Sequence, residues 1–285
     1  MATTKKVTHV EGGSASTPSQ QPRWTPTAEA KSAAGKNRMY AVILWVLAVV
    51  AEIAAMVILS KKDPEVALTT GQNVLIISIL FVDLILLVAG SSFWKNANRL
   101  DPPSKASAMF AVQSQAGVIM AAVCFVPVLI QAIIKKAWFV VAAAAIFGVG
   151  GGAASADYKP ASQEEYAQQS SYVTELMGSN HVYWTKSGTK YHLYDDCQYL
   201  KSDRTTEIFE GGTVADAYAN NSKIKPEMNS LCSACEKRAA KEKGWTDQQL
   251  QEAKDKAIEA AKNGAAVLEG ALPAEEPQPE PAPQE

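Results

Sequence analysis

Apolar residues are concentrated in the first half of the chain, and polar residues occupy both ends. Between about residues 39 and 156, long runs of apolar side chains alternate with short polar segments. A membrane-spanning helix needs about 20 predominantly apolar residues, with a range of about 17 to 25. Four runs approach or exceed this length, at residues 39–60, 73–94, 109–134 and 138–154. The pattern therefore predicts an α-helical membrane bundle with four transmembrane helices.

The fourth run is the shortest, and it ends in a glycine-rich segment at residues 148–152. Glycine lowers helix stability, but Lys135 and Lys136 leave room for only a tight hairpin after the third run. We therefore expect the fourth run to cross the membrane. If it did not, the C-terminal half of the chain would lie on the opposite side.

The Lys and Arg residues that flank the runs predict the orientation of the bundle, because these residues are enriched in cytoplasmic loops. With both termini on one side, that side holds seven of them and the other side holds four. The seven are Lys31, Lys36, Arg38, Lys95, Arg99, Lys105 and Lys159, and the four are Lys61, Lys62, Lys135 and Lys136. The count predicts a multi-pass protein of the plasma membrane with both termini in the cytoplasm.

Two acidic residues interrupt the apolar runs, Glu52 in the first and Asp83 in the second. Ionisable residues at that depth are costly and indicate a functional site by default. Counted from the outer ends of the runs at about 1.5 Å per residue, their depths differ by only about 3 Å, so the two could face each other. No Lys or Arg lies within any run, so at least one carboxyl is expected to stay protonated.

Two interpretations of this candidate intramembrane polar site remain open. In the first, the acids relay a proton or cation, and the protein is a small proton- or cation-coupled transporter or a channel subunit. In the second, they hold the bundle together by interhelical hydrogen bonds, with Ser78, Gln113, Ser114 or Gln115 as partners. The second is favoured, because four spans without a detectable inverted repeat are unlike most transporter folds.

Changes in composition divide the chain into six segments. The ends are polar and rich in residues that cannot form a core, which predicts disorder. Thr246 and Gln249 have the spacing of a capping box and precede a weak apolar stripe, which predicts an amphipathic helix. The segments are a disordered tail (1–37), the membrane region (38–156), a juxtamembrane linker or helix (157–180), a metal-binding module (181–244), the amphipathic helix (245–269) and a disordered acidic tail (270–285).

The module at 181–244 holds three of the four cysteines and two of the three histidines. His192, Cys197, Cys232 and Cys235 form a set of one nitrogen and three sulfur ligands, which matches the tetrahedral preference of zinc. Four protein ligands leave no coordination position for water or substrate, so the set predicts a structural zinc site. The module is expected to be a small α+β domain.

The local sequence predicts how the ligands are positioned. Residues 183–185 and 190–192 are rich in aromatic and β-branched side chains and predict two strands of a hairpin. The segment after Cys235 is helix-forming, and a helix that starts there would direct backbone N–H groups at the thiolates.

The cysteines allow two other interpretations. A redox Cys-x-x-Cys pair is typical of a βαβ context, which is not visible here, and the cysteines could also be buried without a ligand. His181 is expected to be a surface residue, and Asp195 and Asp196 are expected to be solvated loop charges.

The module resembles a small zinc-binding module related to the metal-binding domain of the Ada DNA-repair protein, a module that also occurs beside nucleases and on membrane proteins. The resemblance covers about a fifth of the chain, and it implies a compact fold that holds zinc through the four ligands named above. It rests on Val182, Tyr183, Thr185, Gly188, Lys190, Tyr191, His192, Cys197, Leu200, Cys232 and Cys235.

The sequence departs from that module at three points. Four residues separate His192 from Cys197 instead of the usual three, the segment from Cys197 to Cys232 is longer than usual, and Leu231 replaces a usual proline. The loop geometry is therefore expected to differ. The methyl-transfer chemistry of the Ada protein itself is not carried over.

Charge and composition bear on the function. The chain has a net charge of −2 and a pI near 6.0, and residues 181–243 carry ten basic and nine acidic side chains. Zinc with three thiolates brings the module close to neutral, so we do not expect nucleic acid as a partner, although Lys237, Arg238, Lys241 and Lys243 cluster on one predicted helix.

No Ser-His-Asp set and no phosphate-binding glycine motif is found, so we do not expect an enzyme. The leading hypothesis is a binding, scaffold or regulatory protein that contacts membrane lipid and a cytoplasmic protein partner. A membrane-tethered nucleic-acid-processing accessory is a further alternative.

Overall fold

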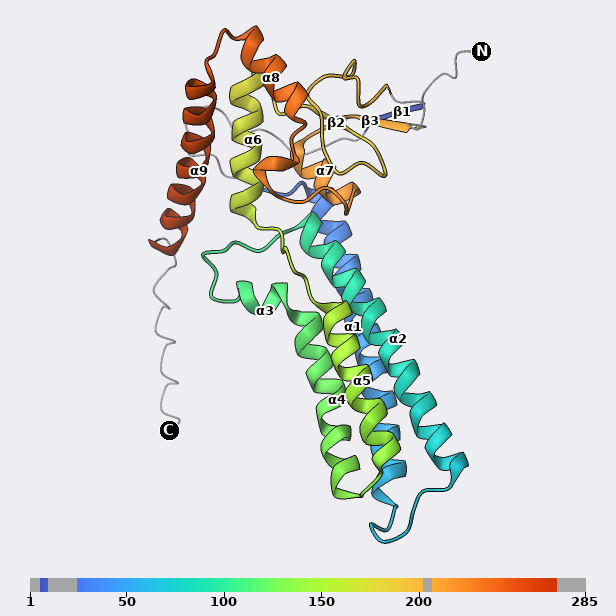
Figure 1. The fold of residues 1–285 in the computed structure, drawn as a ribbon. Helices are drawn as coiled ribbons and strands as arrows, with labels where there is room; N and C mark the ends of the chain where they lie inside the picture. Colours follow the sequence, from blue (N-terminus) through green and yellow to red (C-terminus); the bar gives the residue numbers. More distant parts are fainter. Residues whose placement is uncertain (1–5, 10–24, 202–206, 271–285) are drawn as a thin grey trace, which may run out of the picture.

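The computed structural model describes residues 6–9, 25–201 and 207–270 of the 285-residue chain. Four of its helices are long and apolar enough to cross a membrane: α1 (Ala28–Ser60), α2 (Thr70–Leu100), α4 (Ala116–Ile134) and α5 (Trp138–Ser155). They form an elongated bundle with a smaller mixed domain at one end (Figure 1). This agrees with the predicted helical bundle joined to a small α+β domain.

The bundle is built from two antiparallel helix pairs. α1 packs along α2 and α4 packs along α5, and the pairs are joined by contacts of α1 with α4 and of α2 with α5. The loops α1–α2 and α4–α5 meet at the end far from the mixed domain (Figure 1). There Lys62 Nζ donates to the carbonyl of Lys135 at 2.7 Å, and Lys135 Nζ donates to the carbonyl of Lys62 at 2.7 Å.

The buried face of α1 repeats every seven residues. Ala34, Ala41, Ala48 and Ala55 form one buried row, and Trp45, Glu52 and Leu59 form the other. A seven-residue repeat with two apolar positions is the pattern by which two helices pack closely along their lengths. α2 carries a matching repeat, with Ile76, Leu80, Asp83, Leu87 and Gly90 buried.

Helix α1 begins ten residues before the predicted membrane region, so part of the predicted disordered tail is helical. Thr27 caps this start by accepting a hydrogen bond from the Ala30 N–H at 3.1 Å, and Glu29 lies in the first turn. Both features stabilise a helix N-terminus. The helix is also anchored by an ion pair of 2.9 Å between Arg38 and Asp101.

The third predicted span is interrupted. It divides into a short helix, α3 (Phe110–Ser114), and α4, with Gln115 between them. The Gln115 side chain donates to the carbonyl of Asp157 at 2.8 Å. This bond ties the break to the segment that follows α5, so the interruption is supported by a contact that lies far away in the sequence.

The mixed domain contains three strands and several helices in the described residues. β2 (Val182–Trp184) pairs antiparallel with β3 (Glu207–Gly212), and β1 (Lys6–His9) pairs parallel with β3 on its other side. Neither β1 nor β3 was predicted. β1 falls inside the predicted disordered tail of residues 1–37, and its pairing requires the edge of a strand some 200 residues away.

The helices of this domain surround one hydrophobic core. They are α6 (Gln163–Met177), α7 (Val214–Asn220), α8 (Ser233–Glu242) and α9 (Asp247–Gly270), with a 3-10 turn, η1 (Met228–Ser230). The core includes Tyr172 and Val173 of α6 and Leu250 and Ala257 of α9. The folded unit is therefore larger than the predicted module of residues 181–244, because the flanking helices share its core.

Each flanking helix has a capping feature at one of its ends. α6 lies in the predicted juxtamembrane segment and ends at Gly178, whose φ of 76° is readily adopted by glycine. The predicted capping box is present: Gln249 N–H donates to Thr246 Oγ1 at 3.3 Å, and Thr246 N–H donates to Gln249 Oε1 at 2.8 Å. α6 and α9 lie side by side (Figure 1).

Candidate metal centre

His192 is positioned by a short backbone pairing next to β2. Its N–H donates to the Tyr183 carbonyl and its carbonyl accepts from the Tyr183 N–H, both at 2.8 Å. The predicted hairpin is reduced to this single pair, because β2 forms its sheet with β3 instead. The turn between Tyr183 and His192 is held by Asn221, whose Nδ2 donates to the carbonyls of Thr185 and Gly188 at 2.7 Å each.

Cys232 is brought to His192 by a second backbone pairing. Tyr191 N–H donates to the Ser230 carbonyl at 3.0 Å, and Cys232 N–H donates to the Tyr191 carbonyl at 2.9 Å. Tyr191 thus pairs with the segment that enters α8, while its neighbour His192 pairs with β2. Two segments about 40 residues apart in the sequence therefore present their ligands to the same point.

Cys235 lies in the first turn of α8, and Cys232 is the residue that caps this helix. Two residues separate them, so both thiols lie at the helix N-terminus. The fourth ligand, Cys197, lies in a turn after His192, in which the Leu200 N–H donates to the Cys197 carbonyl at 2.9 Å. The four ligands therefore come from one loop and one helix end.

The four side chains converge on one point. One candidate ligand atom from each of His192, Cys197, Cys232 and Cys235 lies within 4.8 Å of the other three, and all four residues are buried. The distance from Cys235 Sγ to His192 Nδ1 is 3.8 Å. Ligand atoms about 2.0–2.3 Å from a tetrahedral zinc ion lie about 3.5–3.8 Å from one another. The cluster could therefore hold a metal ion, and the three sulfur atoms are free thiols without a disulfide.

Hydrogen bonds from neighbouring ligands favour a thiolate at Cys232. A hydrogen bond with the Cys235 thiol, supported by His192 and by the Cys235 backbone N–H, lowers the pKa of the Cys232 thiol. The same hydrogen bond, together with burial, raises the pKa of Cys235. The thiolate is the form of cysteine that binds metal. The predicted direction of the α8 N–H groups toward the sulfur ligands is in agreement with this arrangement.

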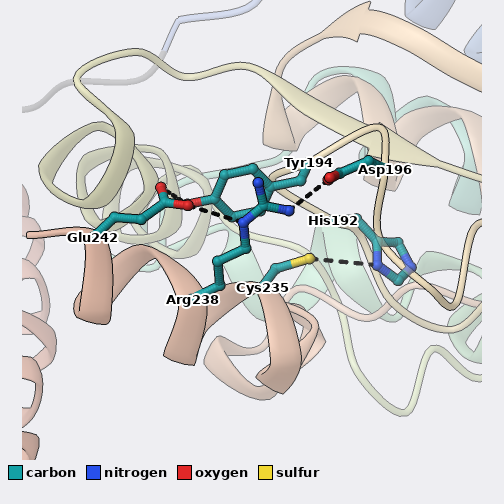
Figure 2. A network of polar contacts seen from close by, with 6 residues as sticks. All are labelled: His192, Tyr194, Asp196, Cys235, Arg238 and Glu242. Carbon is teal, nitrogen blue, oxygen red and sulfur yellow. Dashed lines mark hydrogen bonds and ion pairs between the residues drawn. The ribbon is translucent and has the colours of Figure 1, made fainter.

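A polar network joins the two parts of the site. Arg238 of α8 donates to Asp196 Oδ1 at 2.6 Å and to Glu242 Oε1 at 2.9 Å, and its guanidinium lies 3.9 Å from the centre of the Tyr194 ring. The Tyr194 hydroxyl donates to Glu242 Oε2 at 2.7 Å. Figure 2 shows that Arg238 extends from α8 toward the loop between His192 and Asp196. The network therefore links the loop that carries two ligands to the helix that carries the other two.

Some of the predicted surface residues have partners in the structure. Asp196 pairs with Arg238 and is thus more than a solvated loop charge. His181 lies outside the ligand cluster and packs edge-on against the Tyr183 ring, with centroids 5.0 Å apart. Of the basic residues on the predicted helix, Arg238 is engaged in ion pairs and Lys243 lies over the Trp245 ring. Fewer of these charges are therefore available to contact nucleic acid.

The sequence predicted the four ligands but not the segments that hold them in place. Asn221 and β3 were not singled out, and both act through contacts with β2 and its turn. A short signal for β3 was present in Ile208 and Phe209, because β-branched and aromatic residues favour strands. A Cβ at Gly212 would lie 2.4 Å from Cη2 of Trp184, so only glycine allows β3 to pass this close to the buried indole.

The two acids of the predicted spans, Glu52 and Asp83, are buried within the bundle. Glu52 is 3% exposed and Asp83 is fully buried. Three of their oxygens, both of Asp83 and Oε1 of Glu52, have no hydrogen-bond partner within hydrogen-bonding geometry among the described residues. Two of the suggested partners bond elsewhere, Ser114 to the Ala111 carbonyl at 3.2 Å and Gln115 to the Asp157 carbonyl at 2.8 Å. Among the described residues, Ser114 and Gln115 therefore do not hydrogen-bond to the Asp83 carboxyl.

Comparison of the chain with protein-family models, with curated proteins and with solved structures finds no match in any of the three. The resemblance to the Ada-type zinc module therefore rests on the quoted residues alone and stays a prediction.

Proposed function

We propose that the protein is an integral membrane protein that presents a zinc-stabilised module to a cytoplasmic protein partner, as a scaffold or regulatory subunit. The convergence of His192, Cys197, Cys232 and Cys235 on one buried point is the observation that carries this proposal. Three sulfur ligands and one imidazole suit zinc, and a site closed by four protein ligands has no position for a substrate. A stabilising and binding role follows more readily from this ligand set than catalysis does.

The attachment of the module to the bundle supports a presenting role. Arg99, near the end of α2, donates to the carbonyls of Tyr218 at 3.4 Å and Ser222 at 3.2 Å, and its own carbonyl accepts from the Tyr166 hydroxyl at 2.9 Å. The side chain and the backbone of one residue therefore bind both α6 and the segment around α7. These bonds fix the module on the end of the longest helix pair.

A second set of contacts joins the α2–α3 loop to the start of α6. The Glu164 carboxylate accepts from the Lys105 N–H at 3.0 Å and from the Ser104 hydroxyl, and Lys105 Nζ pairs with Glu165 at 2.7 Å. With the Arg99 contacts, they restrict the module to one orientation. A surface held in a fixed orientation can bind a partner without the entropy cost of ordering itself first.

Zinc content tests the metal part of the proposal. The full-length protein, purified in detergent without chelators, is expected to carry about one zinc per chain by inductively coupled plasma mass spectrometry. Cys232→Ser is expected to carry far less, while Ser233→Ala, which changes the exposed neighbour of that ligand, is expected to retain it. Absence of zinc from both the wild type and Ser233→Ala would refute the metal site.

Partner binding tests the role. Photo-crosslinking from an exposed position of the module, such as Tyr199 at 60% exposure, is expected to capture the same protein repeatedly in intact cells. The capture should be lost in Cys232→Ser and should persist in Glu65→Gln, which alters the far end of the bundle. Crosslinking that is identical in Cys232→Ser and in the wild type would remove the module from the interaction.

A further inference from the structure

The contact between α1 and α2 places two acids opposite each other. Gly90 of α2 lies against the indole of Trp45 of α1, and a Cβ there would be only 2.7 Å from the ring. Seven residues after Trp45 in α1 is Glu52, and seven residues before Gly90 in the antiparallel α2 is Asp83. Seven residues are nearly two helical turns and rise about 10.5 Å. Glu52 and Asp83 therefore lie at one level and on the facing sides of the two helices.

Each acid also meets α4. The Cys124 thiol lies beside the Asp83 carboxyl, the Val128 backbone N–H lies beside the Glu52 carboxyl, and the two acids interact electrostatically with each other. Three of their four oxygens nevertheless have no partner at hydrogen-bonding geometry among the described residues. Buried polar groups are almost always paired, so unpaired oxygens on two facing carboxyls favour a group that both of them can bind.

No positive side chain is available to neutralise the pair. α5 has no ionisable residue and α4 has only Cys124, while between Arg38 and Lys61 and between Thr70 and Lys95 the only ionisable residue besides the two acids is Tyr40, which is not cationic. The nearest in sequence is Lys61, nine residues from Glu52, or about 13 Å along the helix. Two carboxylates facing each other in a medium of low dielectric would repel strongly.

We propose that Glu52 and Asp83 form an intramembrane proton-binding site, in which one proton is shared between the facing carboxyl groups and exchanges with the aqueous phase. A proton needs only two oxygens, whereas cations such as Mg²⁺ and Ca²⁺ take six or more oxygen ligands. A thiol and an N–H donor complete the surroundings, and neither is an oxygen ligand. This site goes beyond the proposed binding role of the module and does not depend on it.

Proton binding controls the charge at the centre of the α1–α2 contact. When the shared proton leaves, two negative charges remain buried between the helices, and the contact is weakened. Since α2 continues into the Arg99 contacts with the module, the site lies on the helix that joins the membrane region to the module. Proton occupancy is thus expected to alter the stability of the bundle.

Dicyclohexylcarbodiimide tests the site because it adds covalently to protonated carboxyls in apolar surroundings. The wild-type protein in lipid nanodiscs is treated with dicyclohexylcarbodiimide at a series of pH values from acid to alkaline. Peptide mass spectrometry then identifies the residue that carries the added mass. We expect modification at Glu52 or Asp83 that decreases as the pH rises. In Asp83→Asn the neighbouring charge is absent, so modification of Glu52 should decrease at a lower pH than in the wild type.

Glu65→Gln is the matched control, because Glu65 is an exposed acid outside the spans that pairs with Lys136. It should leave the modification pattern unchanged. The proposal is overturned if neither acid reacts at any pH, if reaction is independent of pH, or if Asp83→Asn leaves the pH dependence at Glu52 unchanged.

Infrared spectroscopy of the wild type keeps the proposal testable if the variants do not fold. Acid-minus-alkaline difference spectra should show the carbonyl stretch of a carboxylic acid that is shielded from water. A difference spectrum that lacks this band would contradict a proton-binding site.

Discussion

The indole of Trp45 covers Gly90, and the two residues fix how α1 and α2 lie against each other. The Trp45 Nε1–H points to the Leu87 carbonyl at 3.4 Å, and the ring also packs against Trp94 with centroids 5.3 Å apart. A large residue on one helix thus fits against a residue without a side chain on the other. The same register places Glu52 opposite Asp83, so this contact positions the intramembrane acids as well as the helices.

Gly90→Ala is expected to destabilise the bundle. The new Cβ would lie 2.7 Å from two atoms of Trp45 and 3.1 Å from the Ala41 carbonyl oxygen. Overpacking of this kind costs about 1–3 kcal/mol, against a gain of about 1 kcal/mol from the higher helix propensity of alanine. Thermal unfolding in detergent, followed by helical circular dichroism, should therefore show a lower Tm.

Gly35→Ala is the matched control for this prediction. Gly35 lies in α1, and a Cβ at that position would have no neighbour within 4 Å. It should raise the Tm slightly through helix propensity alone. Equal Tm values for the two variants would show that Trp45 and Gly90 are not in close contact.

Glu164→Gln is expected to weaken the junction between the bundle and the module near neutral pH. Partial burial acts to raise the pKa of Glu164, but hydrogen bonds from the Lys105 N–H and the Ser104 hydroxyl outweigh it and leave the pKa below its ordinary value of 4.5. Folding therefore favours the carboxylate, and its contribution is present above pH 4.5 and lost as the pH falls through the lower folded value. We expect a loss of about 1 kcal/mol at pH 7, because this hydrogen-bonded charge is partly exposed.

Thermal unfolding of the wild type and Glu164→Gln at several pH values checks this sign. The difference between the two proteins should shrink as the solution becomes more acidic than pH 4.5. Both proteins carry the same candidate metal ligands, so the measurement compares the difference between their Tm values at each pH. A difference that grows with acidity would contradict the assignment.

Arg238→Ala is expected to speed the loss of zinc from the module. Arg238 links Asp196, which precedes the ligand Cys197, to the helix that carries Cys232 and Cys235. Without it, the loop and the helix end separate more readily. Transfer of zinc to a coloured chelator, followed by absorbance, should be faster than in the wild type.

Lys237→Ala is the control for Arg238→Ala, since Lys237 is an exposed neighbour on the same helix. It should release zinc at the rate of the wild type. Equal rates for all three proteins would show that the network of Arg238 does not support the site.

The orientation of the bundle predicts which positions can be labelled from outside the cell. A cysteine introduced at Glu65, in the α1–α2 loop, should react with a membrane-impermeant maleimide in intact cells. A cysteine introduced at Lys256, on the exposed face of α9, should react only after lysis. The reverse pattern would invert the predicted orientation, which rests on the seven Lys and Arg residues at the module end and four at the other.

Several properties of this protein could be predicted because they depend on residues close together in the sequence. The four helices that are long and apolar enough to cross a membrane follow from the lengths of apolar runs, since spanning a bilayer requires a minimum length of apolar helix. The cap of Thr246 and Gln249 follows from their spacing. The ligand set follows from the chemistry of one imidazole and three thiols, and the structure places those four residues together.

A seven-residue repeat in the sequence also indicates where α1 begins and which of its faces is buried. The alanines at 34, 41, 48 and 55 recur every seven residues and form one buried row of α1. This repeat extends into the predicted tail, so it could have placed the start of α1 before residue 38. It also assigns Glu52 to the face that meets α2.

The tertiary structure alone decided the features that join distant segments. The sequence determined which side chains are apolar, which can bind metal and where the cap of α9 lies, since each of these is a property of one short segment. It did not determine that β1 pairs with β3, that Arg99 binds the α7 segment, or that Gly90 admits Trp45. Such pairings depend on the shapes of two surfaces formed far apart in the chain, and only folding brings these surfaces together.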